Sequence, residues 1–203
     1  MRRQGRPCAG KYPEAVATET TDDGSAEAIE HDAPPSRTFL WLTLTIAVAV
    51  LVVDQLTKLW AVAALEGQPP VPIIGSLLQL NFIRNPGAAF SLGSGFTIIF
   101  SLIAIGVAVV IVRTARTLGS ATWAVALGGL LGGALGNVID RIFREPSVLR
   151  GHVVDFIEIT HWPVFNVADM AITCSAALMV ILTIKGIPLR GRPAGAASLA
   201  PDA

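Results

Sequence analysis

The chain has 203 residues and a formal net charge of zero; 52% of its residues are hydrophobic and only 15% are charged. Its mean hydropathy of +0.60 is too high for an ordinary soluble domain of this length. The zero net charge gives no sign of a polyanion-binding surface, so we expect no nucleic-acid partner.

The two ends of the chain differ in composition from its middle. Residues 1–38 hold seven acidic and five basic residues but few large apolar ones, and such a composition cannot form a core. Residues 186–203 are rich in Gly, Pro and Ala. We therefore expect a disordered N-terminal extension over 1–38, a membrane domain over 39–185 and a disordered tail over 186–203.

Four apolar segments are long enough to cross a bilayer, which takes about 20 residues. They are apolar on all sides, whereas the helices of a soluble bundle would have a polar face. Four spans put both termini on one side, and the loop carrying Arg113 and Arg116 has no acidic residue, so the positive-inside rule places that side in the cytoplasm. The segments are 39–63, 96–112, 121–139 and 164–184.

Glycines recur in the third segment with small-xxx-small spacing, which predicts close packing of this span against its neighbours. These glycines are Gly128, Gly129, Gly132, Gly133 and Gly136.

The loop after the first segment contains a predicted strand at residues 77–85, which read LLQLNFIRN. Leu78, Leu80 and Phe82 alternate with polar residues, and the alternation lapses once, at Ile83. The strand leads into NPGAAF, whose Pro and Gly indicate a turn.

Ionisable residues in or beside membrane spans are costly and are candidates for function. Asp54 and Lys58 lie one helical turn apart in the first segment and can pair, either to fix helix packing or to serve a site. Asp140, Asp155 and Asp169 gather on the outer side, because the third and fourth segments run in opposite directions.

Two of the three outer acids are expected to act together. Two carboxyls that share a site cannot easily both ionise, so one can be a base toward water while the other is an acid toward a carbonyl. Asp140 has Arg141 and Arg144 close by in the sequence, which favours a charged, structural role. Asp155 and Asp169 have apolar neighbours and are the favoured pair. The expected hydrogen-bond supports are Asn137 and Asn166.

Other site chemistries fit the sequence poorly. His31, His152 and His161 lack the spacing of metal ligands, and Cys8 and Cys174 lie in segments too different to form a disulfide framework. We therefore expect no metal and no cofactor.

Five motifs resemble those of lipoprotein signal peptidase, also called signal peptidase II, in their order and topology. The resemblance covers about residues 39–185. The motifs are DQLTK (54–58), NPGAAF (85–90), GGALGNVIDR (132–141), GHVVDF (151–156) and FNVAD (165–169).

The resemblance implies an integral membrane protein, mainly α, with four transmembrane helices, a small extracytoplasmic β-structured cradle and a small outer helix. It implies an aspartic endopeptidase that needs no metal and cleaves bacterial prolipoproteins just before a cysteine carrying diacylglyceryl. The catalytic aspartates of the family fall on Asp155 and Asp169, and Asp140 matches a supporting position. Other motif positions near the site fall on Asp54, Lys58, Asn85, Asn137, Arg141 and Asn166.

The resemblance further implies a multi-pass protein of the bacterial plasma (inner) membrane, with cytoplasmic termini and its active site at the outer face. Diacylglyceryl-modified prolipoproteins and membrane lipids are the expected partners, and a monomer is the expected state. An alternative is a small proton-coupled transporter with Asp54, Asp140 and Asp169 as a relay, although the halves of the chain show no internal repeat. A structural membrane subunit would leave the outer acids unexplained.

Overall fold

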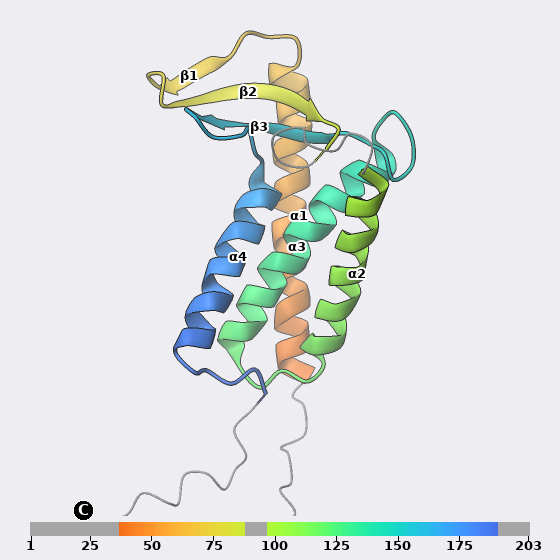
Figure 1. Ribbon diagram of the computed structural model, residues 1–203, viewed down its shortest axis with the longest axis vertical. Coiled ribbons are helices and arrows are strands. Elements are labelled where there is room, and N and C mark those ends of the chain that lie inside the picture. Colours follow the sequence, from red (N-terminus) through yellow and green to blue (C-terminus); the bar gives the residue numbers. More distant parts are fainter. Residues whose placement is uncertain (1–36, 88–96, 191–203) are drawn as a thin grey trace, which may run out of the picture. The chain divides into compact units, whose positions relative to one another are not determined.

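The computed structural model describes residues 37–87 and 97–190. Over these ranges the chain forms four helices and a three-stranded antiparallel sheet of order β1-β2-β3 (Figure 1). The helices are α1 (Arg37–Leu65), α2 (Thr97–Ala115), α3 (Ala121–Phe143) and α4 (Val167–Ile184). The strands are β1 (Val71–Ile74), β2 (Leu78–Asn85) and β3 (Val153–Ile159).

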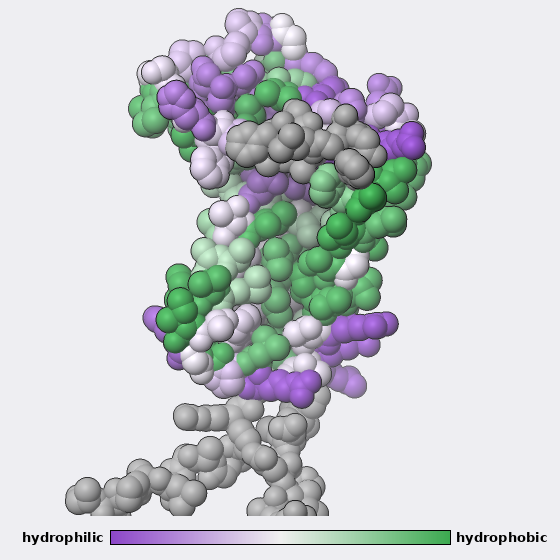
Figure 2. Space-filling model, in the orientation of Figure 1, coloured by the Kyte–Doolittle hydropathy of each residue, from purple (hydrophilic) through white to green (hydrophobic). Residues whose placement is uncertain are grey.

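The four predicted membrane spans are confirmed, since each helix is long and apolar enough to cross a bilayer. Figure 2 shows hydrophobic residues over the middle of the helices and hydrophilic residues toward both ends. The predicted strand over 77–85 is confirmed as β2. The small outer helix implied by the resemblance has no counterpart within residues 37–87 and 97–190.

Helix α3 is the centre of the bundle and contacts each of the other three helices. In its most apolar window 61% of the residues are buried, against 17–22% in the other helices. A Cβ atom at Gly132 would lie 2.6 Å from the carbonyl oxygen of Ala47 on α1, and one at Gly133 would lie 2.6 Å from that of Ala168 on α4. The predicted close packing is therefore confirmed on two faces of the helix, and only glycine permits it.

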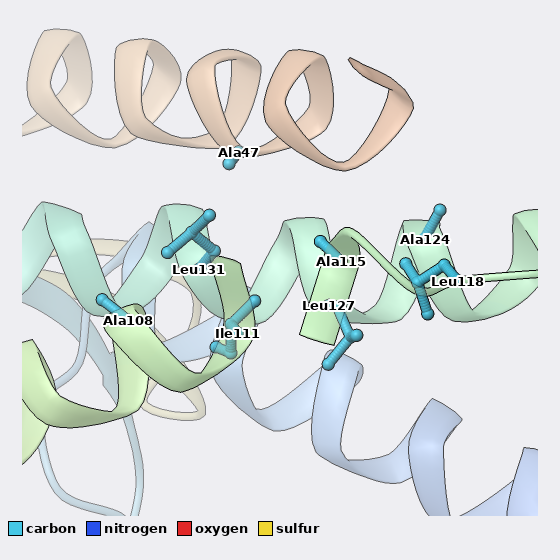
Figure 3. Close-up of a cluster of buried hydrophobic side chains, with 8 residues drawn as sticks. All are labelled: Ala47, Ala108, Ile111, Ala115, Leu118, Ala124, Leu127 and Leu131. Atoms are coloured by element: carbon cyan, nitrogen blue, oxygen red, sulfur yellow. The ribbon is translucent and has the colours of Figure 1, made fainter. Parts of the chain in front are cut away.

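Small and branched apolar side chains fill the space between α1, α2, α3 and the turn that joins α2 to α3 (Figure 3). Alanine lets the backbones approach closely while leucine and isoleucine fill the remaining volume. The cluster consists of Ala47, Ala108, Ile111, Ala115, Leu118, Ala124, Leu127 and Leu131.

The start of the predicted C-terminal tail differs from the prediction, because residues 186–190 pack against the bundle. The indole N–H of Trp123 donates to the carbonyl oxygen of Ile187 at 2.9 Å, and the amide of Gly119 donates to that of Leu189 at 3.0 Å. Composition could not reveal these contacts, since the partners lie 64 and 70 residues apart in the sequence. Near the N-terminus of the chain, α1 begins at Arg37, which lies inside the predicted extension of residues 1–38. Residues 1–36 and 191–203 lie outside the described residues.

The sheet lies across one end of the helices, with its strands running roughly crosswise to them (Figure 1). Val154 and Phe156 of β3 pack on Ala61 and Leu65 at the end of α1. This contact fixes the height of β3 above the bundle. Asp155 lies in β3 on the opposite face from these two side chains.

Candidate active site

Asp155 on β3 and Asp169 in the first turn of α4 line one cavity of about 390 Å³. The structure therefore brings together the two carboxyls favoured from the sequence. Asn85, Asn137 and Arg141, also singled out from the sequence, line the same cavity. The remaining wall includes Gly87, Val153, Trp162, Pro163, Val164 and Phe165.

A β-bulge in β2 brings Asn85 to the face that carries Asp155. Leu80 pairs with Ile157 and Asn85 pairs with Val153, so five positions along β2 match four along β3. In a regular strand, residues five apart point to opposite faces. The bulge adds one residue between Leu80 and Ile83, so the Asn85 side chain points to the same face of the sheet as Leu80 and Asp155. In the sequence, this bulge corresponds to the break at Ile83 in the alternation of apolar and polar residues.

Asp169 is held by the helix that it begins. Asn166 is the N-cap of α4, and its side-chain oxygen accepts from the amide of Asp169 at 3.0 Å. The carboxylate of Asp169 accepts in return from the amide of Asn166, at 3.3 Å. This capping box gives hydrogen-bond partners to two free N–H groups at the N-terminus of α4. It also fixes the position of the Asp169 side chain there. The FNVAD motif is therefore a helix start as well as a site motif.

Three asparagine side chains present their N–H groups to the two carboxyls. Asn166 Nδ2 donates to Asp155 Oδ1 at 2.6 Å, and Asn85 Nδ2 donates to Asp155 Oδ2 at 2.9 Å. Asn137 Nδ2 donates to Asp169 Oδ1 at 2.8 Å. With the Asn166 amide on Asp169 Oδ2, each of the four carboxyl oxygens accepts one N–H.

The orientation of each of these amides follows from a partner that can only donate. The oxygen of Asn137 accepts from Lys58 Nζ at 3.0 Å, and that of Asn85 accepts from the amide of Gly87 at 3.0 Å. The oxygen of Asn166 accepts from the amide of Asp169. Because ammonium and backbone N–H groups cannot accept hydrogen bonds, each asparagine must turn its NH₂ group toward a carboxyl.

Burial raises the pKa of Asp155 to about 7, because desolvation disfavours its charged form. The hydrogen bond from Asn85 lowers this pKa, the negative charge of Asp169 raises it, and the hydrogen bond from Asn166 lowers it again. Asp155 is only 2% exposed. It can therefore hold or release a proton near neutral pH, as one member of a pair that shares protons.

Beneath the cavity, Lys58 forms a buried charge network. Its ammonium lies 2.9 Å from Asp54 Oδ2, 3.0 Å from Asp140 Oδ2 and 3.0 Å from Asn137 Oδ1. The predicted pairing of Asp54 with Lys58 is present. All three charged side chains are fully buried. None of the three lines the cavity, and Lys58 contacts the site through the side chain of Asn137.

Asp140 is anchored by cations as the sequence suggested, with Arg144 among them, but Lys58 takes the place expected for Arg141. Arg144 Nε lies 2.6 Å from Asp140 Oδ1, and Lys58 takes the other oxygen. The amide of Val154 also donates to Asp140, at 3.2 Å, which ties β3 to α3. Arg141, expected beside Asp140, turns away from it.

Arg141 binds backbone carbonyls around the cavity. Its guanidinium donates to the carbonyl oxygens of Pro86 and Gly151 at 3.2 Å each and to that of Gly87 at 2.5 Å. The side chain joins the segment after β2 to the segment before β3, and the planar fork of arginine suits such a set of acceptors.

Sequence reasoning missed Gln55, which donates to Asp54 Oδ2 and to the carbonyl oxygen of Gly136, both at 3.1 Å. Its position beside Asp54 in the DQLTK motif was the available signal. Throughout the described part of the chain, every buried side-chain nitrogen and oxygen has a hydrogen-bond partner. Within the same residues no three His, Cys, Asp or Glu side chains are grouped as metal ligands.

Comparison with known proteins gives consistent matches over most of the chain. The family model described as "Signal peptidase (SPase) II" matches residues 46–185. The lipoprotein signal peptidase of Rhodococcus jostii (strain RHA1) is 48% identical over 174 residues, 86% of this chain and 87% of the relative. That of Streptomyces griseus is 50% identical over 177 residues, 86% of this chain and 90% of the relative.

A solved structure also resembles the chain. It is that of a bacterial membrane enzyme determined by the in meso method at 1.9 Å resolution. The two chains are 32% identical with a TM-score of 0.61, and the match covers 70% of this chain and 92% of the other.

The hydrogen bond from Asn85 can be tested by titrating Asp155. The protonated carboxyl should give an infrared band that disappears around pH 7 and is absent in Asp155→Asn. Because the Asn85 bond stabilises the charged form, Asn85→Ala should move this midpoint to higher pH. Gln79→Ala, a control in the same strand that removes a bond to Glu158, should leave it unchanged. A midpoint that stays in place or falls in Asn85→Ala would contradict the assignment.

Proposed function

This chain belongs to the signal peptidase II family, and we propose that it works as an aspartic endopeptidase with Asp155 and Asp169 as its catalytic pair. It removes the signal peptide from prolipoproteins. The observation that carries the proposed catalytic type is the shared cavity of two carboxyls, each held in place by two N–H groups.

In the proposed reaction one carboxyl of the pair is ionised and the other carries a proton. The ionised carboxylate takes a proton from a water molecule, whose oxygen attacks the carbonyl carbon of the scissile peptide bond. The protonated carboxyl gives its proton to the carbonyl oxygen. When the C–N bond breaks, the proton taken from water goes to the leaving nitrogen and the hydroxyl proton returns to the other carboxyl. The pair thus ends with one proton, as it began.

The amide groups fit this scheme because they hold both carboxyls and leave each oxygen able to accept a further hydrogen bond. The raised pKa of Asp155 lets the pair keep a proton at neutral pH. We assign no fixed position to that proton, since the two groups titrate as a unit.

We infer that the scissile bond lies just before a cysteine carrying diacylglyceryl. Asp169 is in the first turn of a membrane-spanning helix, and Asp155 is in the sheet that covers the end of the bundle. A water molecule between them would lie at the boundary of the apolar helices. That is the depth at which a peptide anchored by a lipid-modified cysteine presents its backbone.

We propose that both termini are cytoplasmic and that the site faces the outer side of the bacterial plasma membrane. Three of the four arginines on the sheet side are occupied: Arg141 binds carbonyls, Arg144 binds Asp140, and Arg84 pairs with Glu66 at 2.7 Å. The fourth, Arg150, is exposed and has no ion pair among the described residues. At the other end Arg113, Arg116 and Arg190 have no ion pair among the described residues. This distribution supports the positive-inside assignment.

We also propose that the protein acts as a monomer, because a single chain supplies both carboxyls and all four N–H groups that bind them. The alternative of a proton-coupled transporter finds no support in the family match. Two acids of its relay, Asp54 and Asp140, are bound to Lys58 instead of lining a path.

The catalytic assignment predicts the behaviour of three variants. Asp155→Asn and Asp169→Asn should each lower the cleavage rate of a diacylglyceryl-modified prolipoprotein peptide by ~1,000-fold or more, and the double variant should be scarcely worse. The reason is that water and substrate need both carboxyls at once. The rate is measured by mass spectrometry of the cleaved peptide with purified protein.

Glu158→Gln is the matched control for this series. It removes a carboxylate from the same strand, three residues on, where Glu158 accepts from Gln79 and Asn81 away from the cavity. This variant should cleave the peptide at nearly the rate of the unaltered protein. Near-normal cleavage by well-folded Asp155→Asn would refute the assignment, as would a loss in Glu158→Gln equal to that in Asp155→Asn.

The orientation can be tested with single cysteines in a chain whose Cys8 and Cys174 are changed to serine. Ser76→Cys in the β1–β2 turn should react with a membrane-impermeant maleimide in intact cells. Thr117→Cys in the α2–α3 turn should react only after permeabilisation, because the two turns lie at opposite ends of the helices (Figure 1). The reverse pattern would place the site in the cytoplasm.

A further inference from the structure

A second hollow, of about 410 Å³, lies against the lipid-facing side of α4. It shares Trp162, Phe165 and Asp169 with the cavity of the aspartate pair. The two spaces therefore meet at Asp169, with Trp162 and Phe165 between them. The rest of the lining comes from two places, Ile159 and Thr160 at the end of β3, and Met170, Thr173 and Cys174 on the first two turns of α4.

The end of the sheet forms the roof of this hollow. Thr160 donates through its hydroxyl to the carbonyl oxygen of Ser76, which joins the end of β3 to the β1–β2 turn. Figure 1 shows this turn projecting beyond α4. The sequence from residue 67 to residue 83 contains no charged residue. The large hydrophobic residues exposed in this range are Val71, Ile73, Ile74, Leu77 and Ile83.

The floor of the hollow lies inside the membrane. Cys174 is seven residues into α4, so it lies about 10 Å along the helix from Val167. Met170 is 47% exposed and Trp162 is 67% exposed in the isolated chain. An uncharged roof over an apolar floor opens toward lipid at the depth of the outer leaflet.

We propose that this hollow binds one acyl chain of the diacylglyceryl group on the substrate cysteine. The inference rests on the proposed function and adds a site for the lipid. The alternative occupant, a stretch of signal peptide, would bring backbone N–H and C=O groups that need partners. Among the lining groups that could pair with them, the hydroxyl of Thr160 is already bound to the β1–β2 turn, which leaves the side chains of Asp169, Thr173 and Trp162. An acyl chain has no such groups.

The position of the hollow explains what such a site would do. A chain seated along α4 would hold the modified cysteine next to Asp169, where the hollow and the catalytic cavity meet. Contacts remote from the reacting atoms can position the scissile bond in this way. Trp162, at the junction, would contact the first part of the lipid.

The test compares two substrates with the same peptide, one carrying dipalmitoyl and one carrying dihexanoyl glyceryl, in lipid nanodiscs. Cys174→Trp fills the floor of the hollow and should raise KM for the long-chain substrate about tenfold, with little change for the short-chain one. Ile181→Trp is the matched control, since Ile181 is also lipid-exposed and lies two turns further along the same face of α4. It should change neither KM.

Photocrosslinking gives a second readout that does not depend on turnover. A substrate with a diazirine in one acyl chain, irradiated with the Asp155→Asn protein, should label residues 159–174. Labelling confined to α1 or α2, or spread evenly over all lipid-facing helices, would show contact with bulk lipid only and overturn the inference. An unchanged chain-length preference in folded Cys174→Trp would overturn it equally.

The two substrates also separate this inference from the function on which it rests. If the unaltered protein cleaves neither peptide, the proposed function fails and the acyl site fails with it. If it cleaves both and Cys174→Trp behaves like Ile181→Trp, only the acyl site is wrong.

Discussion

The buried ammonium of Lys58 is the interaction on which the rest of this structure depends. It has three N–H groups and three acceptors, on Asp54, Asp140 and Asn137. Each carboxylate then receives a backbone amide from another element, Ala168 at the start of α4 and Val154 in β3. One cation on α1 thus connects α1, α3, α4 and the sheet. With Arg144 on Asp140, two positive and two negative side chains balance in a place where an unpaired charge would cost several kcal/mol.

The same cation sets the direction of the hydrogen bonds in the site above it. Lys58 can only donate, so Asn137 must face it with oxygen and give its NH₂ group to Asp169. The backbone N–H groups of Gly87 and Asp169 orient Asn85 and Asn166 in the same manner. The two carboxyls are therefore held by hydrogen-bond donors whose orientation is already fixed before substrate binds. Such preorganisation is what electrostatic catalysis requires, because little has to reorient during the reaction.

Much of this arrangement could be predicted from the sequence. The lengths of the apolar segments predicted the four spans, and the spacing of the glycines predicted the close packing of α3. The arginines near Asp140 in the sequence indicated a structural role for this residue and distinguished it from Asp155 and Asp169. Other features depend on contacts between distant segments and had no local signal. The partners of Arg141 are backbone carbonyls, which any sequence offers. Residues 186–190 pack through an indole and a loop amide that composition does not reveal. The bulge in β2 did leave a trace, the broken alternation at Ile83, but its role in turning Asn85 toward Asp155 needs the register with β3.

The most direct test of the role of Lys58 is a double-mutant cycle with Asp54, which has no other ion-pair partner among the described residues. The account predicts that Lys58→Met lowers the free energy of unfolding in mixed micelles by about 3–5 kcal/mol, because Asp54 is left buried and unpaired. Adding Asp54→Asn should recover roughly 2 kcal/mol or more of this loss. The double variant should still cleave poorly, since Asn137 has lost the donor that orients it. Effects that add to within about 0.5 kcal/mol, or a double variant with normal cleavage, would contradict the account.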